Sequence, residues 1–360
     1  MMFFKRHKKV HISLITALAV IAAFHIVKGN RGWMNFFAQN VTDPVKHAIS
    51  QVSYALPFSA MELLIAIVII ALLGALIRFI YTMAKGGDKH TVYSFFMGLV
   101  SLALSVYALF CLFWGVNYYT DSFQDRSGLT ARMATVEELK EVAMIFVEGL
   151  EETADLVARD ENGLYAENED EIFAKSVSVY DNLCEEFPCL AYEDRVPKKM
   201  AFGRFMSRMG FTGIYFIFLG ESNLNVDAPA AFLPATIAHE LGHQRSIASE
   251  QECNFTGIMA SITSDDPAYR YSGYLLGFIH LSNALYRADQ EVWEEVRSQL
   301  PEAALADIRY NNAYWDQFED GVVDKVSNTV YDTMLKSNGQ KDGMKSYGTV
   351  VDLLVAYYLK

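Results

Sequence analysis

The sequence feature that most constrains this chain is His239-Glu240-Leu-Gly-His243, in which two histidines four residues apart enclose a glutamate. On an α-helix, positions i and i+4 lie about 40° apart around the axis and one turn apart along it. Both imidazoles can therefore reach one metal ion, and Glu240 projects beside them, where it can act as a base. The spacing predicts a Zn²⁺ site on a helix.

The surroundings of the motif favour a metal site over an accidental match. A bare HExxH pattern is expected by chance in roughly one chain in a hundred of this length. Here Pro234 marks the start of a helix, and Ile237 and Leu241 give that helix an apolar face. The alternative is a helical His-Glu-His that is only hydrogen-bonded at a surface.

A third metal ligand is expected beyond the two histidines, because catalytic zinc commonly holds three protein ligands. The nearby candidates are Glu250 and Glu252. On an unbroken helix Glu250 would lie roughly 10 Å beyond His243 along the axis, too far to share the metal. We therefore expect a break at residues 246–249, after which Glu250 binds the metal and Asn254 orients a ligand histidine. Glu252 is the alternative third ligand.

Three long apolar stretches, whose single charged residue is Arg78 near one end of the second, predict a membrane anchor in residues 1–119. With 52% hydrophobic residues, the chain is too apolar for an ordinary soluble protein. The predicted spans are residues 10–27, 63–84 and 92–116, each long enough to cross a bilayer. The first span could also be a signal peptide, but no convincing cleavage site follows it.

The distribution of basic residues predicts the orientation of these spans. The N-terminus and the 78–90 connection carry seven Lys and Arg, whereas residues 28–46 carry three. By the positive-inside rule the N-terminus is cytoplasmic. The chain is then a multi-pass membrane protein. Because the number of spans is odd, residues 120–360 form an extracytoplasmic domain.

Residues 120–360 form the second predicted domain, with 20 Lys and Arg against 40 Asp and Glu. Such an acidic domain is a poor binder of nucleic acid. Residues 213–219 are aromatic and β-branched between glycines, which predicts a strand. This strand could pair with a substrate backbone, or it could only pack in the core. Most of the remaining pattern is helical, including a long helix over 312–336 and a last one over 349–358, so the chain is predicted to be mainly α with a small β-sheet.

The four cysteines imply no disulfide framework. Cys184 and Cys189 could close a small disulfide on an oxidising side of the membrane, and two buried free thiols are an equally consistent interpretation.

The motif and its surroundings resemble known families. The run HELGHQRSIASEQECNF, with ESNLNV before it and RYSGY after it, and with YDTMLKSNGQKDG and SYGTVVDLL near the C-terminus, resembles an uncharacterised family of bacterial membrane proteins, a domain of unknown function. The resemblance covers nearly the whole chain. More distantly, the motif region resembles the gluzincin metallopeptidases, which have a zincin-like fold. That resemblance implies His239, His243 and Glu250 as zinc ligands and Glu240 as the catalytic base. Relatives often have Gly where this chain has Ser246.

These observations predict a membrane-bound zinc peptidase that hydrolyses an extracytoplasmic protein or peptide. Zinc lowers the pKa of a water towards ~7, and Glu240 takes the proton of that water. Tyr271, Tyr274 and His280 are candidate donors to the developing oxyanion, although each could simply be a core residue. The alternative from another class is a non-enzymatic membrane sensor or envelope assembly factor whose zinc is structural.

Overall fold

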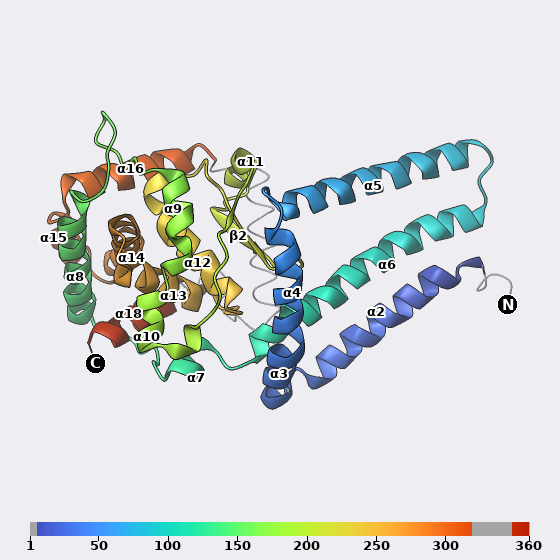
Figure 1. Ribbon diagram of the computed structural model, residues 1–360, viewed down its shortest axis with the longest axis horizontal. Helices are drawn as coiled ribbons and strands as arrows, with labels where there is room; N and C mark the ends of the chain where they lie inside the picture. Colours follow the sequence, from blue (N-terminus) through green and yellow to red (C-terminus); the bar gives the residue numbers. More distant parts are fainter. Residues whose placement is uncertain (1–5, 319–347, 360) are drawn as a thin grey trace. The chain divides into compact units, whose positions relative to one another are not determined.

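The computed structural model describes residues 6–318 and 348–359 of the chain (Figure 1). The described chain is mainly helical with one small sheet, as the sequence predicts. It divides into two compact units. The first comprises Met1–Thr120 together with the short segment Phe216–Glu221, and the second comprises Asp121–Tyr215 and Ser222–Lys360.

The first unit contains the three helices that are long and apolar enough to cross a membrane, among the residues that the structure describes. They are α2 (Lys8–Val27), α5 (Ala60–Ala84) and α6 (Lys89–Phe113). All three helices are strongly apolar, and most of their side chains are exposed. This combination is expected for helices that are surrounded by lipid.

Between the first two long helices the chain is helical, in a stretch for which the sequence analysis predicts no helix. This segment contains α3 (Arg31–Phe37), a π-helical turn (Ala38–Thr42) and α4 (Asp43–Tyr54). Asn30 caps the first of these helices by accepting a hydrogen bond from the Trp33 N–H. Hydropathy alone misses such helices because they are short and only partly apolar.

The segment Phe216–Glu221 belongs to the first unit although it lies far away in sequence. The fully buried Glu221 carboxylate accepts hydrogen bonds from the N–H groups of Ala60 and Met61, at 3.3 and 3.2 Å. A carboxylate at this position satisfies the free N–H groups at the start of α5 and suits the positive end of its dipole.

The second unit is a helical core with a three-stranded mixed sheet beside it. Its N-terminal helices are, in chain order, α7 (Phe123–Ser127), α8 (Val136–Ala154), α9 (Glu169–Lys175), α10 (Asp181–Glu186) and α11 (Gly203–Arg208). The later helices are α12 (Leu233–Gln244), α13 (Glu250–Thr263), α14 (Pro267–Ala288), α15 (Gln290–Arg297), α16 (Glu302–Asp316) and α18 (Gly348–Tyr358). Helices α8, α12, α13 and α14 pack together around fully buried side chains such as Phe146, Ile258 and Leu275.

The sheet has the strand order β1-β3-β2, so β2 (Gly213–Phe216) is an edge strand. The central strand β3 (Glu221–Leu224) is fully buried and pairs in parallel with β1 (Lys198–Lys199). The strand predicted over 213–219 is therefore shorter than expected, and the residues after its turn form a second strand.

Thr135 and Glu138 form the reciprocal capping box that opens α8. Two sequence predictions can be compared with the structure. Of the long helix predicted over 312–336, the structure describes the start as part of α16, and the remainder lies outside the described residues. Cys184 and Cys189 are free thiols.

Candidate metal centre

Helix α12 places the two motif histidines on one face, one turn apart. Pro234 occupies its first turn, where a missing N–H costs nothing, and the next N–H, of Ala235, donates to the Ser272 hydroxyl at 3.0 Å. Ile237 and Leu241 are fully buried in the core. This burial fixes the rotation of the helix about its axis.

The helix ends at the break that the third ligand requires. Ser246 adopts the left-handed backbone conformation, with φ of 63°, and is the single non-glycine residue with positive φ among those described. The next helix then begins at Glu250, where the Ser249 hydroxyl accepts a hydrogen bond from the Glu252 N–H at 3.4 Å. The chain thus reverses between the two helices instead of continuing along one axis.

This reversal brings His239, His243 and Glu250 together into a group that could hold a metal ion. One ligand atom from each lies within 4.8 Å of the other two. Glu250 Oε2 lies 3.3 Å from His239 Nε2, and Glu250 Oε1 lies 3.6 Å from His243 Nε2. For zinc–ligand bonds of about 2.05 Å, a tetrahedral site has ligand separations of about 3.3 Å. The donor set and its spacing are therefore compatible with a tetrahedral metal site.

Close packing of the two helices makes this geometry achievable. A Cβ at Gly257 of α13 would lie 2.8 Å from the backbone nitrogen of His239 and 2.9 Å from its Cα. No side chain fits there, so glycine lets the α13 backbone lie directly against α12 at the first ligand.

The protonation of His243 suits metal binding through Nε2. Its Nδ1–H donates to the Ile247 carbonyl at 2.8 Å, and because a carbonyl only accepts, this nitrogen carries the proton. The Cys253 thiol lies 3.2 Å from the same nitrogen. The sequence predicts Asn254 to orient a ligand histidine, but for His243 the Ile247 carbonyl in the break does so.

Glu250 carries the charge that a metal ligand needs. Burial alone would raise its pKa, but His243 and His239 beside it hold the pKa well below its usual range. The carboxylate is therefore ionised, which is the form that binds a metal.

Glu240 lies beside this group and is buried, with only 4% of the residue exposed. The N–H of Tyr215 on β2 donates to the carboxylate, and burial raises the pKa of Glu240. The second oxygen, Oε2, has no hydrogen-bond partner among the described residues. An orphaned buried oxygen is costly unless a water or substrate group binds it.

Glu252, the alternative third ligand, lies elsewhere. Its buried carboxylate accepts hydrogen bonds from the N–H groups of Phe123 and Gln124, at 2.9 and 3.2 Å. It thus stabilises the start of α7 instead of approaching the histidines.

The three candidate oxyanion donors have different surroundings. The fully buried Tyr271 donates its hydroxyl to Asp307 at 2.5 Å, and the half-buried Tyr274 packs edge-on against Phe146 of α8. His280 is close enough to His239 for their charges to interact, and burial together with His239 lowers its pKa to about 4. Its imidazole is therefore neutral at neutral pH and retains one N–H donor.

The sequence analysis missed the buried ion pair that supports the break. Arg245, at the C-terminal end of α12, binds Asp194 through two hydrogen bonds of 2.6 Å, and both side chains are nearly fully buried. Its Nε also donates to the Leu190 carbonyl, and its guanidinium stacks on the Tyr180 ring at 3.6 Å. An arginine directly after a metal motif is a weak sequence signal, since nothing nearby reveals that its partner lies 51 residues earlier.

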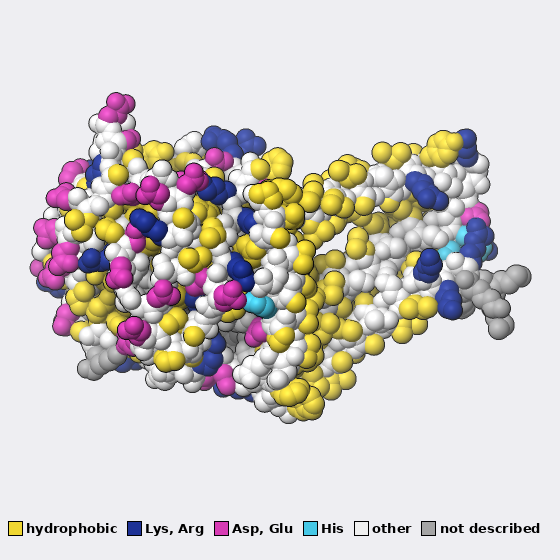
Figure 2. Space-filling model, in the orientation of Figure 1, with side chains coloured by type: hydrophobic (Ala, Val, Ile, Leu, Met, Phe, Trp, Pro, Cys, Tyr) yellow, Lys and Arg dark blue, Asp and Glu magenta, His cyan; other side chains and the backbone are white. Residues whose placement is uncertain are grey.

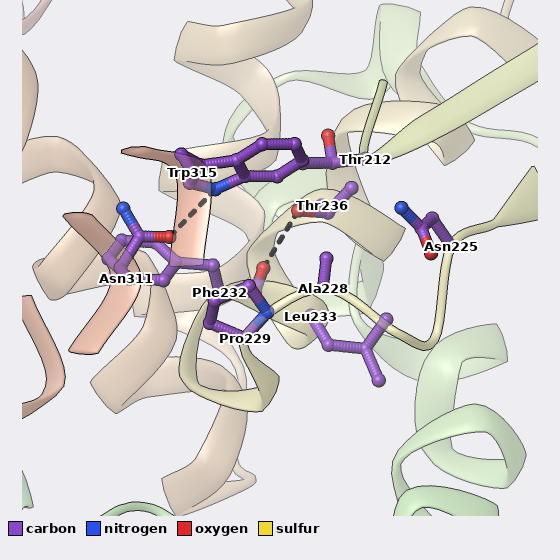
Figure 3. Close-up of a pocket in the computed structure, with 9 residues that line it drawn as sticks. All are labelled: Thr212, Asn225, Ala228, Pro229, Phe232, Leu233, Thr236, Asn311 and Trp315. Carbon is purple, nitrogen blue, oxygen red and sulfur yellow. Dashed lines mark hydrogen bonds between the residues drawn. The ribbon is translucent and has the colours of Figure 1, made fainter. Parts of the chain in front are cut away.

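A pocket also adjoins the motif helix (Figure 3). It is lined by Thr212, directly before β2, and by Trp315 of α16. Thr236, one turn before Glu240 on α12, also lines it. The Trp315 indole donates to Asn311, so the ring is fixed in place. Most of the remaining lining is apolar: Ala228, Pro229, Phe232 and Leu233.

Fold and site together define a mainly helical protein with three helices long enough to cross a membrane and a His-His-Glu group that could hold a metal ion. The chain belongs to the DUF3810 family, described as a protein of unknown function, which matches residues 37–355. The match includes the whole candidate metal centre. Searches among curated proteins and among solved structures found no match.

Proposed function

We propose that this chain is a membrane-bound zinc-dependent peptidase of the HExxH type, similar in its site to the gluzincins. The observation that carries the proposal is the buried Oε2 of Glu240, which has no partner among the described residues and lies beside the His239, His243 and Glu250 group. A purely structural zinc site gains nothing from a second carboxylate with one unsatisfied oxygen beside it, whereas a hydrolytic site requires a base at this position.

A bound zinc ion would act as a Lewis acid, polarising a substrate carbonyl and lowering the pKa of a water towards ~7. His239 Nε2, His243 Nε2 and Glu250 would hold the ion. Glu240 Oε2 accepts the proton of the attacking water and returns it to the leaving nitrogen, while the Tyr215 N–H keeps the carboxylate in position. His280 is the preferred donor to the oxyanion, because its neutral imidazole lies near His239.

Substrate binding would use the sheet and the pocket. An extended peptide would pair with the edge strand β2 and add to the sheet as a further strand. The Thr236 and Trp315 pocket lies beside the N-terminal half of the motif helix and would take one small apolar side chain of that peptide.

The proposal includes an orientation, with the N-terminus in the cytoplasm and the metal centre outside the membrane. It rests on the seven basic residues at one set of span ends against three at the other. A C-terminal alkaline phosphatase fusion is expected to be active in cells and a C-terminal green fluorescent protein fusion dark. The reverse pattern would place the metal centre in the cytoplasm.

The decisive experiment compares the zinc-loaded full chain with Glu240→Gln, both in nanodiscs, on a mixture-based peptide library read by mass spectrometry. Glutamine keeps the shape of the side chain but cannot accept the proton. We expect both proteins to contain about one zinc per chain and only the unsubstituted chain to generate new peptide ends. Equal cleavage by both, or no zinc in either, would refute the proposal. Zinc in both with cleavage by neither would favour the structural-zinc alternative.

A further inference from the structure

One segment of the second unit differs sharply in charge from the rest. Residues 120–360 carry 20 basic and 40 acidic side chains, yet residues 195–220 within them carry five basic side chains and no acidic one. Figure 2 shows dark blue basic side chains gathered beside hydrophobic ones where Figure 1 labels α11, while acidic side chains are spread over much of this unit. The basic segment is therefore a distinct surface.

Two phenylalanines are exposed on this surface. Phe202, directly before α11, is 65% exposed and Phe205 is 55% exposed. They lie three residues apart, and Arg208 lies three residues further, so the three side chains follow one another along one helix face. Exposure of two neighbouring aromatic rings to water is energetically unfavourable, so such a pair beside a guanidinium commonly marks a surface that binds a partner or a membrane.

Among the residues that the structure describes, no acidic side chain pairs with the two arginines of α11. Both Arg204 and Arg208 are exposed, and neither forms an ion pair with any residue that the structure describes. Arg204 instead lies over the Phe318 ring at 5.6 Å. By contrast, Lys199 binds Glu169 at 2.5 Å, and Arg195 binds Glu193 at 3.0 Å.

The opposite face of α11 is firmly held, so the exposed face is a rigid platform. Met206 and Ser207 are buried, and the Ser207 hydroxyl is 2.6 Å from the Tyr314 hydroxyl. The Asn225 side chain donates to Ser207 at 2.8 Å. Movement of α11 into the core would break these bonds, so its phenylalanines cannot be buried that way.

We infer that Phe202, Arg204, Phe205 and Arg208 form a docking surface for a bilayer with anionic headgroups. Phenylalanine rings enter the region between headgroups and acyl chains, and arginines there bind lipid phosphates. The chain connects this surface closely to the membrane anchor. The segment Phe216–Glu221 begins only eight residues after α11, and it belongs to the unit that contains the three long apolar helices. Two arginines are too few for a nucleic-acid site, and the acidic charge of the unit opposes one.

The experiment replaces Phe205 by the photoreactive benzoylphenylalanine in the full chain, reconstituted in nanodiscs of phosphatidylglycerol or of phosphatidylcholine. The matched control carries the same group at Tyr310, which is 50% exposed on α16. On irradiation we expect lipid adducts at position 205 in phosphatidylglycerol, weaker adducts in phosphatidylcholine, and none above background at position 310.

Charge reversal tests the electrostatic part. Arg204→Glu with Arg208→Glu should lower the adduct yield roughly tenfold or more, because each basic residue near an anionic surface changes the equilibrium about fivefold. Arg287→Glu, an exposed arginine on α14, should leave the yield unchanged. Circular dichroism and zinc content show whether each variant is folded. Adducts to a second copy or to the scaffold protein instead of lipid, or equal yields at positions 205 and 310, would overturn the inference.

Discussion

Glu250 and Glu252 lie two residues apart in the first turn of α13, yet their carboxylates bind different parts of the chain. Glu250 lies 3.3 Å from His239 Nε2, whereas Glu252 accepts hydrogen bonds from two N–H groups at the start of α7. Side chains at i and i+2 of a helix point in different directions, so one turn serves both the candidate metal centre and the packing of the domain.

Substitution of each glutamate by glutamine should separate these two roles. Glu250→Gln is expected to lower zinc affinity roughly 100-fold or more, since a neutral amide replaces a charged ligand. Glu252→Gln should keep the zinc and lose about 1.5–3 kcal/mol of stability, because hydrogen bonds to a charged group are lost. Zinc content by mass spectrometry and thermal melting in detergent measure the two effects. Loss of zinc in Glu252→Gln alone would make Glu252 the third ligand.

The break between α12 and α13 gives a prediction about Ser246. A non-glycine residue in the left-handed region costs roughly 1 kcal/mol, and glycine avoids that cost. With φ of 63° at this position, Ser246→Gly should raise the melting temperature by about 2–4 °C, and the β-branched Ser246→Val should lower it. A lower melting temperature in the glycine variant would contradict the observed backbone. As a comparison, Ser249→Ala removes the N-cap of α13 and should cost about 1 kcal/mol.

Much of the candidate metal centre could be predicted from the sequence because its spacing is a property of the helix. The i, i+4 histidines require only 3.6 residues per turn, and the impossibility of Glu250 on an unbroken helix predicts a break. The backbone geometry of the break could not be predicted, since Ser246 adopts a conformation that serine disfavours. Tertiary contacts, including the Arg245 ion pair, stabilise it there.

The three apolar spans were also predictable, because a bilayer imposes both length and composition. The helices over 31–54 were not, since their apolar residues are too few to raise the hydropathy. The role of Glu221 as a cap for α5 could not be predicted either, because it depends on a contact between residues 160 positions apart. Local patterns cannot encode such long-range contacts.

The Arg245–Asp194 pair should be strongly coupled. Removal of one partner leaves a buried charge, so Arg245→Met and Asp194→Asn should each destabilise the domain by roughly 3–5 kcal/mol. The double variant should cost less than the sum of the two. Thermal melting of the four proteins gives the coupling energy, and additive losses would show that the two side chains act independently.

Gly213 should control the position of the proposed base. A Cβ on this residue of β2 would lie 2.7 Å from Oε1 and 2.8 Å from Cγ of Glu240. Gly213→Ala is therefore expected to displace the carboxylate and to lower kcat by roughly 100-fold, as misplacement of a catalytic group by about 1 Å does. Zinc content should not change. Gly29→Ala is the control, because a Cβ there meets no atom within 4 Å. Unchanged turnover in Gly213→Ala would argue against Glu240 as the base.

The last prediction distinguishes His280 from Tyr271 as the oxyanion donor. The neutral imidazole of His280 lies within electrostatic reach of His239, whereas the Tyr271 hydroxyl donates to the buried Asp307. His280→Ala should lower kcat by roughly 10²–10³-fold with little change in KM, because an oxyanion donor acts in the transition state. Tyr271→Phe should leave kcat unchanged and cost about 1.5–3 kcal/mol of stability, since Asp307 loses a donor. Steady-state kinetics on a peptide found by the library screen, with thermal melting beside it, measures both. A large fall in kcat in Tyr271→Phe at full zinc content, with His280→Ala unaffected, would assign the role to the tyrosine and require that its bond to Asp307 opens during turnover.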